Sequence, residues 1–157
     1  MYESDRSMIK ILTVGKIKEK YLEDAIKEYV KRLSKYTKVD IIEVPDENFD
    51  INKTLEKEKQ SILSKISEKD YIITLDIDGE NLSSEEFAKK INNTFLNYSD
   101  ILFIIGGSYG LHPDIKKMSN YKLSFSKMTF PHQLFRVMLL EQIYRAYKIN
   151  NNETYHK

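Results

Sequence analysis

The sequence predicts an α/β fold in which a mostly parallel sheet carries helices on both faces. Five short apolar runs alternate with longer segments in which apolar residues recur every three or four positions. Each short run is apolar throughout, which is typical of strands that are buried on both faces. Because the chain has no linker, repeat or low-complexity stretch, we expect one domain over residues 8–157. Residues 1–7 lack periodicity, and we expect them to form a disordered N-terminal extension.

The first half of the chain predicts two strands and two helices. Residues 9–14 form a buried strand that ends at a glycine, and residues 19–36 form an amphipathic helix with lysines on its outer side. A second strand covers residues 39–44 and is stopped by Pro45. A polar, acidic connection follows, and helical spacing of apolar residues then predicts a helix over about residues 51–67.

The second half predicts the same alternation. A Ser83 or Ser84 N-cap with Glu86 nearby starts the first helix of this half. The elements before the last helix are a strand, a helix, a strand, a short helix and a strand, at residues 71–75, 83–95, 101–105, 113–118 and 121–124.

A helix that is apolar on almost every side runs from Pro131 to about Tyr147. Proline is tolerated in a first helical turn, because the N–H that it lacks has no partner there. Such a helix must be covered on most sides. It is either an ordinary core helix packed on the sheet or a helix covered by a partner subunit.

Composition excludes several classes of site. The chain has no cysteine, so a disulfide, a zinc–thiolate site and a thiol nucleophile are impossible. Three histidines argue against a His-rich metal site, and we expect no metal. No apolar run approaches the roughly 20 residues of a membrane helix, and the polar start MYESDRS is unlike a secretory signal. We therefore expect a cytoplasmic protein.

Positive charge gathers in two parts of a chain whose net charge is only +1. Residues 16–38 and residues 122–157 each carry a net charge of +4. If the two segments meet in space, they form a basic face suited to a polyanion. The alternative is solvated helix faces with scattered lysines.

Two loops at predicted strand ends could bind a ligand. Residues 106–110, GGSYG, allow either a sharp turn or a close approach of a ligand to the backbone. They match neither the dinucleotide fingerprint nor the P-loop. Asp76 and Asp78 could form a carboxylate pair for acid–base chemistry, but their position beside Gly79 favours turn residues.

The last helix and the tail also carry candidate functional residues. His132 and Arg136 lie four positions apart on one helix face. They could be a base and an anion clamp over a strand end, or a capped helix start with a surface arginine. Tyr155 and His156 offer stacking and hydrogen-bonding groups to an unpaired base, although short polar tails usually fray.

Several stretches of the chain resemble one class of enzyme. They are VGKIKEKY at 14–21, IIEVPD at 41–46, IIGGSYGL at 104–111, LSFSKMTFPH at 123–132 and the ending YHK at 155–157. These stretches resemble the small SPOUT-class ribosomal RNA methyltransferases, specifically the large subunit methyltransferase H family, which methylates N3 of a pseudouridine in bacterial 23S ribosomal RNA. The resemblance extends from Met8 to Lys157.

The resemblance implies S-adenosylmethionine as methyl donor, a homodimer, and a C-terminal trefoil knot, which general folding rules would not predict. It implies that the cofactor lies against the knot loops. The cofactor-binding residues would be Leu75, Gly106, Gly107, Phe125, Ser126, Lys127, Met128, Thr129 and Phe130.

The catalytic hypothesis rests on this resemblance. His132 or the tail's His156, with Tyr155 beside it, would help to remove the imide proton of the target base, and Arg136 would stabilise the charge that develops. We expect the substrate to be 23S ribosomal RNA in the assembled ribosome or large subunit, held by phosphate contacts from residues 16–38. A catalytically inactive RNA- or nucleotide-binding α/β module is the alternative. A flavodoxin-like phosphate-binding regulator fits the sheet but not the SFSKMTFPHQ loop.

Overall fold

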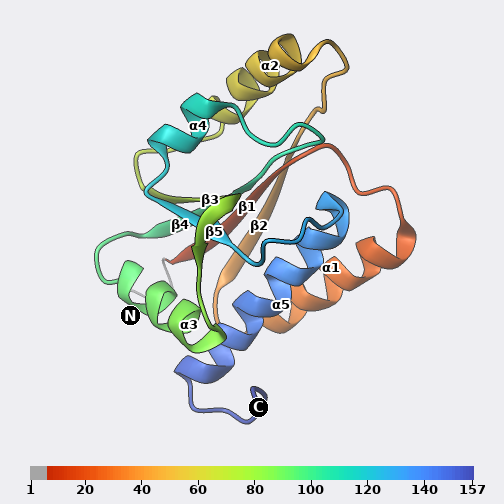
Figure 1. Cartoon of the computed structure of the whole chain (residues 1–157). Coiled ribbons are helices and arrows are strands. Elements are labelled where there is room, and N and C mark those ends of the chain that lie inside the picture. Colours follow the sequence, from red (N-terminus) through yellow and green to blue (C-terminus); the bar gives the residue numbers. More distant parts are fainter. Residues whose placement is uncertain (1–6) are drawn as a thin grey trace.

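The computed structural model describes residues 7–157, which contain five strands and five helices (Figure 1). The strands are β1 (Met8–Val14), β2 (Lys38–Val44), β3 (Asp70–Asn81), β4 (Asp100–Ile105) and β5 (Tyr121–Ser124), and the helices are α1 (Lys20–Leu33), α2 (Ile51–Leu63), α3 (Ser84–Thr94), α4 (Pro113–Met118) and α5 (His132–Asn150). The extension expected over residues 1–7 lies outside the described residues, apart from Ser7.

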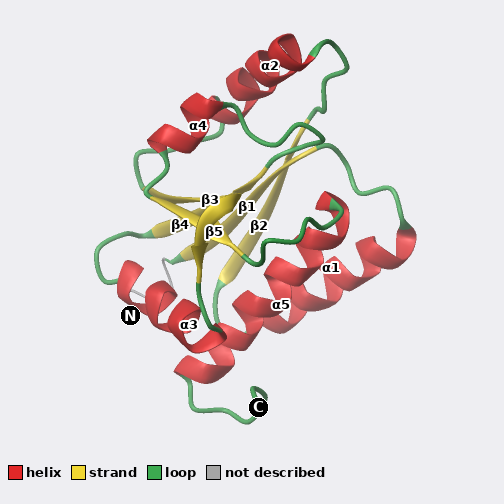
Figure 2. Cartoon of the chain, viewed as in Figure 1, coloured by secondary structure: helices red, strands yellow, loops and turns green. Residues whose placement is uncertain are grey.

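The strands form one sheet in the order β2-β1-β4-β3-β5, and every neighbouring pair is parallel (Figure 2). The predicted α/β class is therefore confirmed, and each expected strand and helix is present. All five strands end at the same edge of the sheet, because they run in one direction. The trefoil knot that the resemblance implies stays a prediction.

Helices cover both faces of the sheet. Figure 1 shows α1, α3 and α5 on one face and α2 and α4 on the other. Helix α5 packs against both α1 and α3, and its inward side chains Leu140 and Ile143 are fully buried. Packing on the sheet therefore accounts for the buried side of α5, whereas Leu134 on its outer side is 39% exposed.

Strand β3 is longer than predicted. The expected strand stopped at Leu75, but β3 continues to Asn81, because its register shifts after Leu75 and Glu80 pairs with β5 again. The intervening residues bulge, and a Cβ on Gly79 would lie 2.6 Å from the carbonyl oxygen of Lys122. The polar composition of this segment predicts a turn, and only pairing with β5 makes it strand.

Helix ends differ from the prediction by a few residues. Ser83 is the N-cap of α3 and forms a capping box with Glu86. It is the first of the two N-caps that the sequence offered, Ser83 or Ser84. Helices α1 and α2 end at Leu33 and Leu63, before the expected limits. Helix α5 starts at His132, so Pro131 is its N-cap residue rather than its first helical residue.

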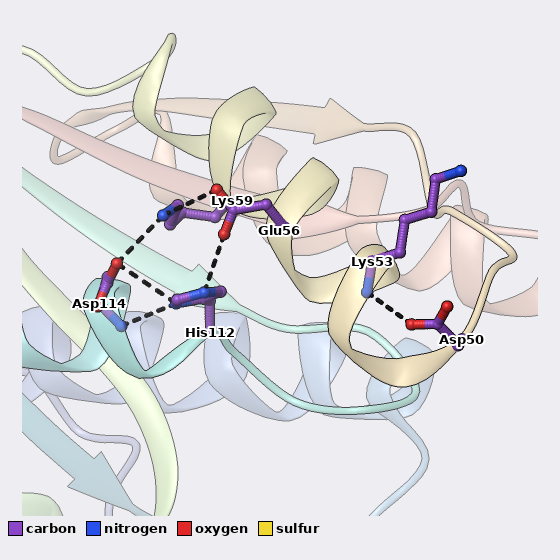
Figure 3. A network of polar contacts seen from close by, with 6 residues as sticks. All are labelled: Asp50, Lys53, Glu56, Lys59, His112 and Asp114. Carbon is purple, nitrogen blue, oxygen red and sulfur yellow. Dashed lines mark hydrogen bonds and ion pairs between the residues drawn. The ribbon is translucent and has the colours of Figure 1, made fainter.

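A polar network fastens α4 to α2 on the second face (Figure 3). Lys59 of α2 pairs with Asp114 of α4 at 3.1 Å and with Glu56 at 3.1 Å. His112 lies 3.2 Å from Glu56, and its Nδ1 accepts the backbone N–H of Asp114 at 3.0 Å, which caps α4. The glycine-rich loop at 106–110 ends just before this anchor. Its far end is therefore held to α2.

Candidate functional site

A cavity opens where β3, β4 and β5 end and α5 begins. Most of the predicted cofactor residues line it: Leu75, Gly106, Phe125, Ser126, Met128, Thr129 and Phe130. These residues come from β3, from the loop after β4 and from the loop after β5, which the parallel sheet brings together at one edge. The cavity is a candidate binding site with an apolar floor and several hydroxyl groups.

Two of the predicted cofactor residues do not line this cavity. Gly107 belongs to the same loop as Gly106 but faces β1, because a Cβ on it would lie 3.0 Å from Cγ1 of Val14, and it does not line the cavity. Lys127 is an exposed residue of the loop after β5. Their roles in cofactor binding stay predictions.

Gly106 is required by the shape of its own loop. A Cβ there would lie 2.5 Å from the carbonyl carbon and oxygen of Gly110. Gly107 and Gly110 form an isolated antiparallel bridge, which closes the loop tightly. Glycine at position 106 therefore lets the backbone of Gly110 pass close by, and both glycines line the cavity without a side chain that would fill it.

Aromatic rings form one wall of the cavity. Phe125 meets Phe135 edge to face at 4.7 Å between ring centroids, and Phe130 stacks on Phe135 at 6.3 Å. The loop after β5 is shaped by hydrogen bonds from its own serines: the Ser124 hydroxyl donates to the Ser126 carbonyl at 3.0 Å, and the Ser126 hydroxyl accepts the Met128 N–H at 3.0 Å. Rings and hydroxyl groups therefore line the same opening.

His132 lies at the start of α5 and lines the cavity. Burial lowers the pKa of its imidazole, and the nearby positive charge of Arg136 lowers it further. A neutral imidazole is the form that can accept a proton. His132 thus lies beside the strand ends, and its role as a base stays a prediction.

Arg136 is buried, with 2% of its residue surface exposed, so the alternative of a surface arginine is wrong. Its Nη2 donates to the carbonyl oxygens of Val14 and Gly15 at 3.0 Å each, and its Nη1 lies 3.3 Å from Oε2 of Glu43. The guanidinium ties α5 to the ends of β1 and β2. It does not line the cavity that contains His132, and its role toward a substrate charge stays a prediction.

The tail folds back along the second half of α5, between Glu141 and Arg145. The Tyr155 hydroxyl donates to Glu141 at 3.0 Å, and burial followed by this hydrogen bond raises the pKa of Tyr155 to about 12. His156 Nδ1 lies 3.0 Å from Arg145, which can only donate, so Nδ1 accepts and Nε2–H donates to Glu85 at 3.0 Å. Within one chain the structure therefore does not bring Tyr155 and His156 to the cavity.

The loop after β1 is fixed beside the start of α5. The Gln133 side chain accepts the N–H of Lys18 at 3.0 Å and donates to the carbonyl oxygen of Lys16 at 3.2 Å. Helix α1, which follows this loop, packs along α5. The two segments that each carry +4 therefore meet, and Lys16 and Lys18 lie close to the first turn of α5.

Comparison with known proteins places the chain in a family. The family model described as "Predicted SPOUT methyltransferase" matches residues 8–156. The chain belongs to the SPOUT methyltransferase family. A relative from Methanococcus maripaludis, named "Putative ribosomal RNA large subunit methyltransferase H", is 56% identical over an alignment 157 positions long that covers 95% of this chain and 99% of the relative.

Solved structures share the fold of this SPOUT chain. The structure of a probable methylase family protein from Haemophilus influenzae superposes with a TM-score of 0.54 at 13% identity, covering 98% of this chain and 71% of that one. The crystal structure of tRNA (m1G37) methyltransferase from Aquifex aeolicus gives a TM-score of 0.54 at 12% identity, covering 88% and 70%. At these identities the likeness shows the fold.

Sequence reasoning missed two features of this SPOUT site. Asp76 lines the cavity, with 5% of its side chain exposed, although its spacing from Asp78 suggested a turn residue. The turn does exist, because Oδ1 of Asp76 accepts the Asp78 N–H at 3.0 Å. The acceptors of Arg136 were also missed, because Val14 and Gly15 are more than a hundred residues away in the chain. A carboxylate directly after a buried strand was the available signal for Asp76.

Two further properties concern residues 7–157. None of their helices is long and apolar enough to cross a membrane. Among the same residues, no group of three or more His, Asp or Glu side chains is placed to hold a metal ion.

Proposed function

We propose that this SPOUT protein uses S-adenosylmethionine to methylate N3 of a pseudouridine in 23S ribosomal RNA. Family membership supports methyl transfer, and the name of the 56% identical relative supports large-subunit ribosomal RNA as the substrate. The observation that carries the proposal is the cavity in which Leu75, Gly106 and the loop after β5 converge beside His132.

The chemistry of the cavity fits S-adenosylmethionine. Adenine requires an apolar slot with hydrogen-bonding groups at its edges, and Leu75, Phe125 and Phe130 supply apolar surface. The hydroxyls of Ser124 and Thr129 line the same opening and can bind polar groups. When bound, the cofactor supplies a methyl group on a positively charged sulfur. Transfer of that group is an in-line displacement that depends mainly on alignment.

His132 is the residue that we assign to the imide proton of the target base. Its lowered pKa keeps the imidazole neutral, and it lines the cavity in which the reacting atoms would meet. Arg136 holds the first turn of α5 against β1, and its positive charge contributes to the lowered pKa of His132. Arg136 therefore acts on the reaction through the position and charge state of His132 in this proposal.

The homodimer is also part of the proposal. Tyr155 contacts Glu141 and His156 contacts Arg145, which lie nine and 13 residues after His132 and so about 14 and about 20 Å further along α5. A tail so far from its own cavity could instead complete the cavity of a second copy. Met128 is 74% exposed, and Phe130 and Leu134 are also exposed near the cavity. These apolar side chains offer a surface on which a second copy could pack.

Lys16 and Lys18 are the residues that we expect to grip the RNA near the site. Gln133 holds their loop beside the first turn of α5. On α1, by contrast, Lys20 and Lys27 are paired with Asp24 and Glu23. Within residues 7–157, neither Lys16 nor Lys18 forms an ion pair within 4.0 Å, so neither loses such a pair when it binds a phosphate.

The test has two stages. Calorimetric titration of the protein with S-adenosylmethionine should show binding, and sedimentation should show a dimer. Methylation is then assayed on assembled ribosomes, large subunits and bare 23S ribosomal RNA, and mass spectrometry locates the methyl group. Ribosomes that carry uridine in place of the pseudouridine are the matched control. Absence of binding at millimolar cofactor would refute the proposal, and binding without methylation of any substrate would favour the inactive module.

A further inference from the structure

Asp76 is a buried carboxylate whose negative charge is only partly compensated. Its side chain is 5% exposed and lines the cavity, whereas Asp78, two residues later, is exposed. One oxygen, Oδ1, accepts the N–H of Asp78. The other, Oδ2, lies 3.6 Å from the amino group of Lys116, which is beyond hydrogen-bond length. The turn uses only Oδ1 and does not by itself require a buried carboxylate.

A second buried aspartate on the same strand, Asp70, is compensated by a cation at closer range than Asp76. Asp70, at the opposite end of β3, has a side chain with no exposed surface. Its role is that of a structural ion-pair partner. It lies 2.9 Å from the amino group of Lys10 and also accepts the N–H of Ser67 at 2.8 Å. Burying a carboxylate is costly unless a cation compensates it closely. Asp70 has such a cation at 2.9 Å, which it shares with Asp100, whereas the cation paired with Asp76 lies farther away, at 3.6 Å.

The balance of charge in the cavity therefore depends on Asp76. Of the residues that line the cavity, all within the described part of the chain, Asp76 is the one acidic side chain. His132 is the one basic side chain among them, and its neutral form leaves the carboxylate as the main fixed charge. Lys116 stands outside the lining and is 35% exposed, so solvent screens its charge.

The methyl donor and the product left after transfer differ in one charge. In S-adenosylmethionine the sulfur carries three carbon substituents and a positive charge. After the acceptor nitrogen has bonded to the methyl carbon, the electron pair of the broken carbon–sulfur bond stays on sulfur. The product, S-adenosylhomocysteine, is therefore a neutral thioether at that atom. Adenine, ribose and the amino-acid group are unchanged.

Building on the proposed function, we propose that Asp76 makes this cavity prefer the positively charged methyl donor over the demethylated product. The carboxylate attracts the sulfonium before transfer and loses that attraction when the sulfur becomes neutral. The product is then held less tightly than the donor and can be replaced by it. Asp76 is thus a specificity-determining residue of the cofactor site.

The test compares ligands that differ at this position alone. Wild-type protein and Asp76→Asn are titrated with S-adenosylmethionine, with S-adenosylhomocysteine and with sinefungin, which carries a positively charged amine in place of the methylated sulfur. Asp76→Asn should weaken the binding of S-adenosylmethionine and of sinefungin about tenfold. Its affinity for S-adenosylhomocysteine should change by less than about threefold. Asp78→Asn is the matched control, because it removes a nearby carboxylate that does not line the cavity, and its affinity ratios should equal those of wild type.

The outcomes separate this inference from the proposed function. Wild-type protein that binds none of the three ligands would overturn both. Wild-type protein that binds them, with Asp76→Asn weakening donor and product equally or neither, would overturn the role of Asp76 alone. If Asp76→Asn does not fold, Lys116→Met carries the test. Removal of that cation should raise the preference for S-adenosylmethionine over S-adenosylhomocysteine, and an unchanged ratio would overturn the assignment.

Discussion

Arg136 Nη2 lies 3.0 Å from the carbonyl oxygen of Val14, so a buried guanidinium fastens the first turns of α5 to the carboxyl end of β1. The same nitrogen donates to Gly15, and Glu43 supplies the nearest negative charge. Any loss of turnover after a change at position 136 will therefore contain a structural part. Stability has to be measured together with activity.

Arg136→Ala should lower the free energy of unfolding by about 3 kcal/mol, because it leaves buried carbonyl groups unpaired and removes a buried charge partner. Urea denaturation measures the change. Arg32→Ala is the control: this exposed arginine pairs with Glu28 on α1, and its loss should cost less than about 1 kcal/mol. If Arg136→Ala keeps wild-type stability but loses turnover, the residue acts in the reaction itself and not through the fold.

Gly106→Ala should abolish binding of S-adenosylmethionine and destabilise the protein. The added methyl would collide with backbone atoms of Gly110 at 2.5 Å, so the whole loop must move. Gly107→Ala is the neighbouring control, because its Cβ would meet one methyl group of Val14 at 3.0 Å, which can shift slightly. Calorimetry on both variants checks the prediction. Equal loss in the two variants would show that Gly107 also belongs to the binding surface.

These glycines show how far sequence reasoning reaches in this protein. The alternation of apolar runs with helical segments is a local pattern. It predicts the strands and their parallel direction, and therefore that their carboxyl ends lie at one edge of the sheet. The need for glycine at Gly106 arises from Gly110, and the bulge of β3 before Glu80 arises from pairing with β5. The burial of Arg136 likewise depends on carbonyl groups of β1. Such contacts join residues that are far apart in the chain, so the spacing of apolar residues in the sequence does not reveal them.

The family resemblance supplied what pattern could not. It implied that Leu75, Gly106 and the loop after β5 belong to one site, and the structure places them around one cavity. It gave no role to Asp76, whose neighbours suggested a turn. Sequence alone does not distinguish a turn aspartate from one that lines a cavity when both follow a strand. The burial of Asp76, whose side chain is 5% exposed, makes that distinction.

Stability should depend on pH through His132. Its pKa in the folded protein lies below its value in the unfolded chain, mainly because of burial. Below about pH 6.5 the unfolded state therefore binds more protons, so stability falls as the pH decreases through this range and is fully present above it. His132→Gln should lack this component.

Urea denaturation of both proteins between about pH 7.5 and pH 5.5 isolates the effect, since other groups titrate equally in the two. The advantage of wild type over His132→Gln should shrink as the pH falls. An advantage that is constant over the range, or that grows at low pH, would contradict a neutral His132 in the folded protein.

Ribosome binding should depend on salt through the loop after β1. Replacing Lys16 and Lys18 by alanine should weaken binding and reduce the slope of log affinity against log salt by about 2, one for each phosphate that is no longer neutralised. Lys20→Ala with Lys27→Ala is the matched pair, because those lysines are already bound to Asp24 and Glu23. Filter binding at several salt concentrations gives both slopes. Equal slopes for the two pairs would argue that the grip lies elsewhere on the protein.

A site completed by the partner's tail leads to a complementation experiment. A His132→Ala chain and a chain with both Tyr155→Ala and His156→Ala should each be inactive as homodimers. In a random mixture, half of the dimers contain one chain of each kind. If the tail serves the partner's cavity, one of the two sites in such a dimer has both parts intact, so about a quarter of the wild-type activity should return. If each tail served its own cavity, every site in the mixture would carry a defect and no activity would return.

If the tail has to leave its own chain to reach a second copy, the contacts of Tyr155 with Glu141 and of His156 with Glu85 hold it back before assembly. Glu85→Gln weakens one of those contacts. It should therefore raise the rate at which activity appears after the two defective chains are mixed. An unchanged rate would show that the pair of His156 and Glu85 does not hold the tail before assembly.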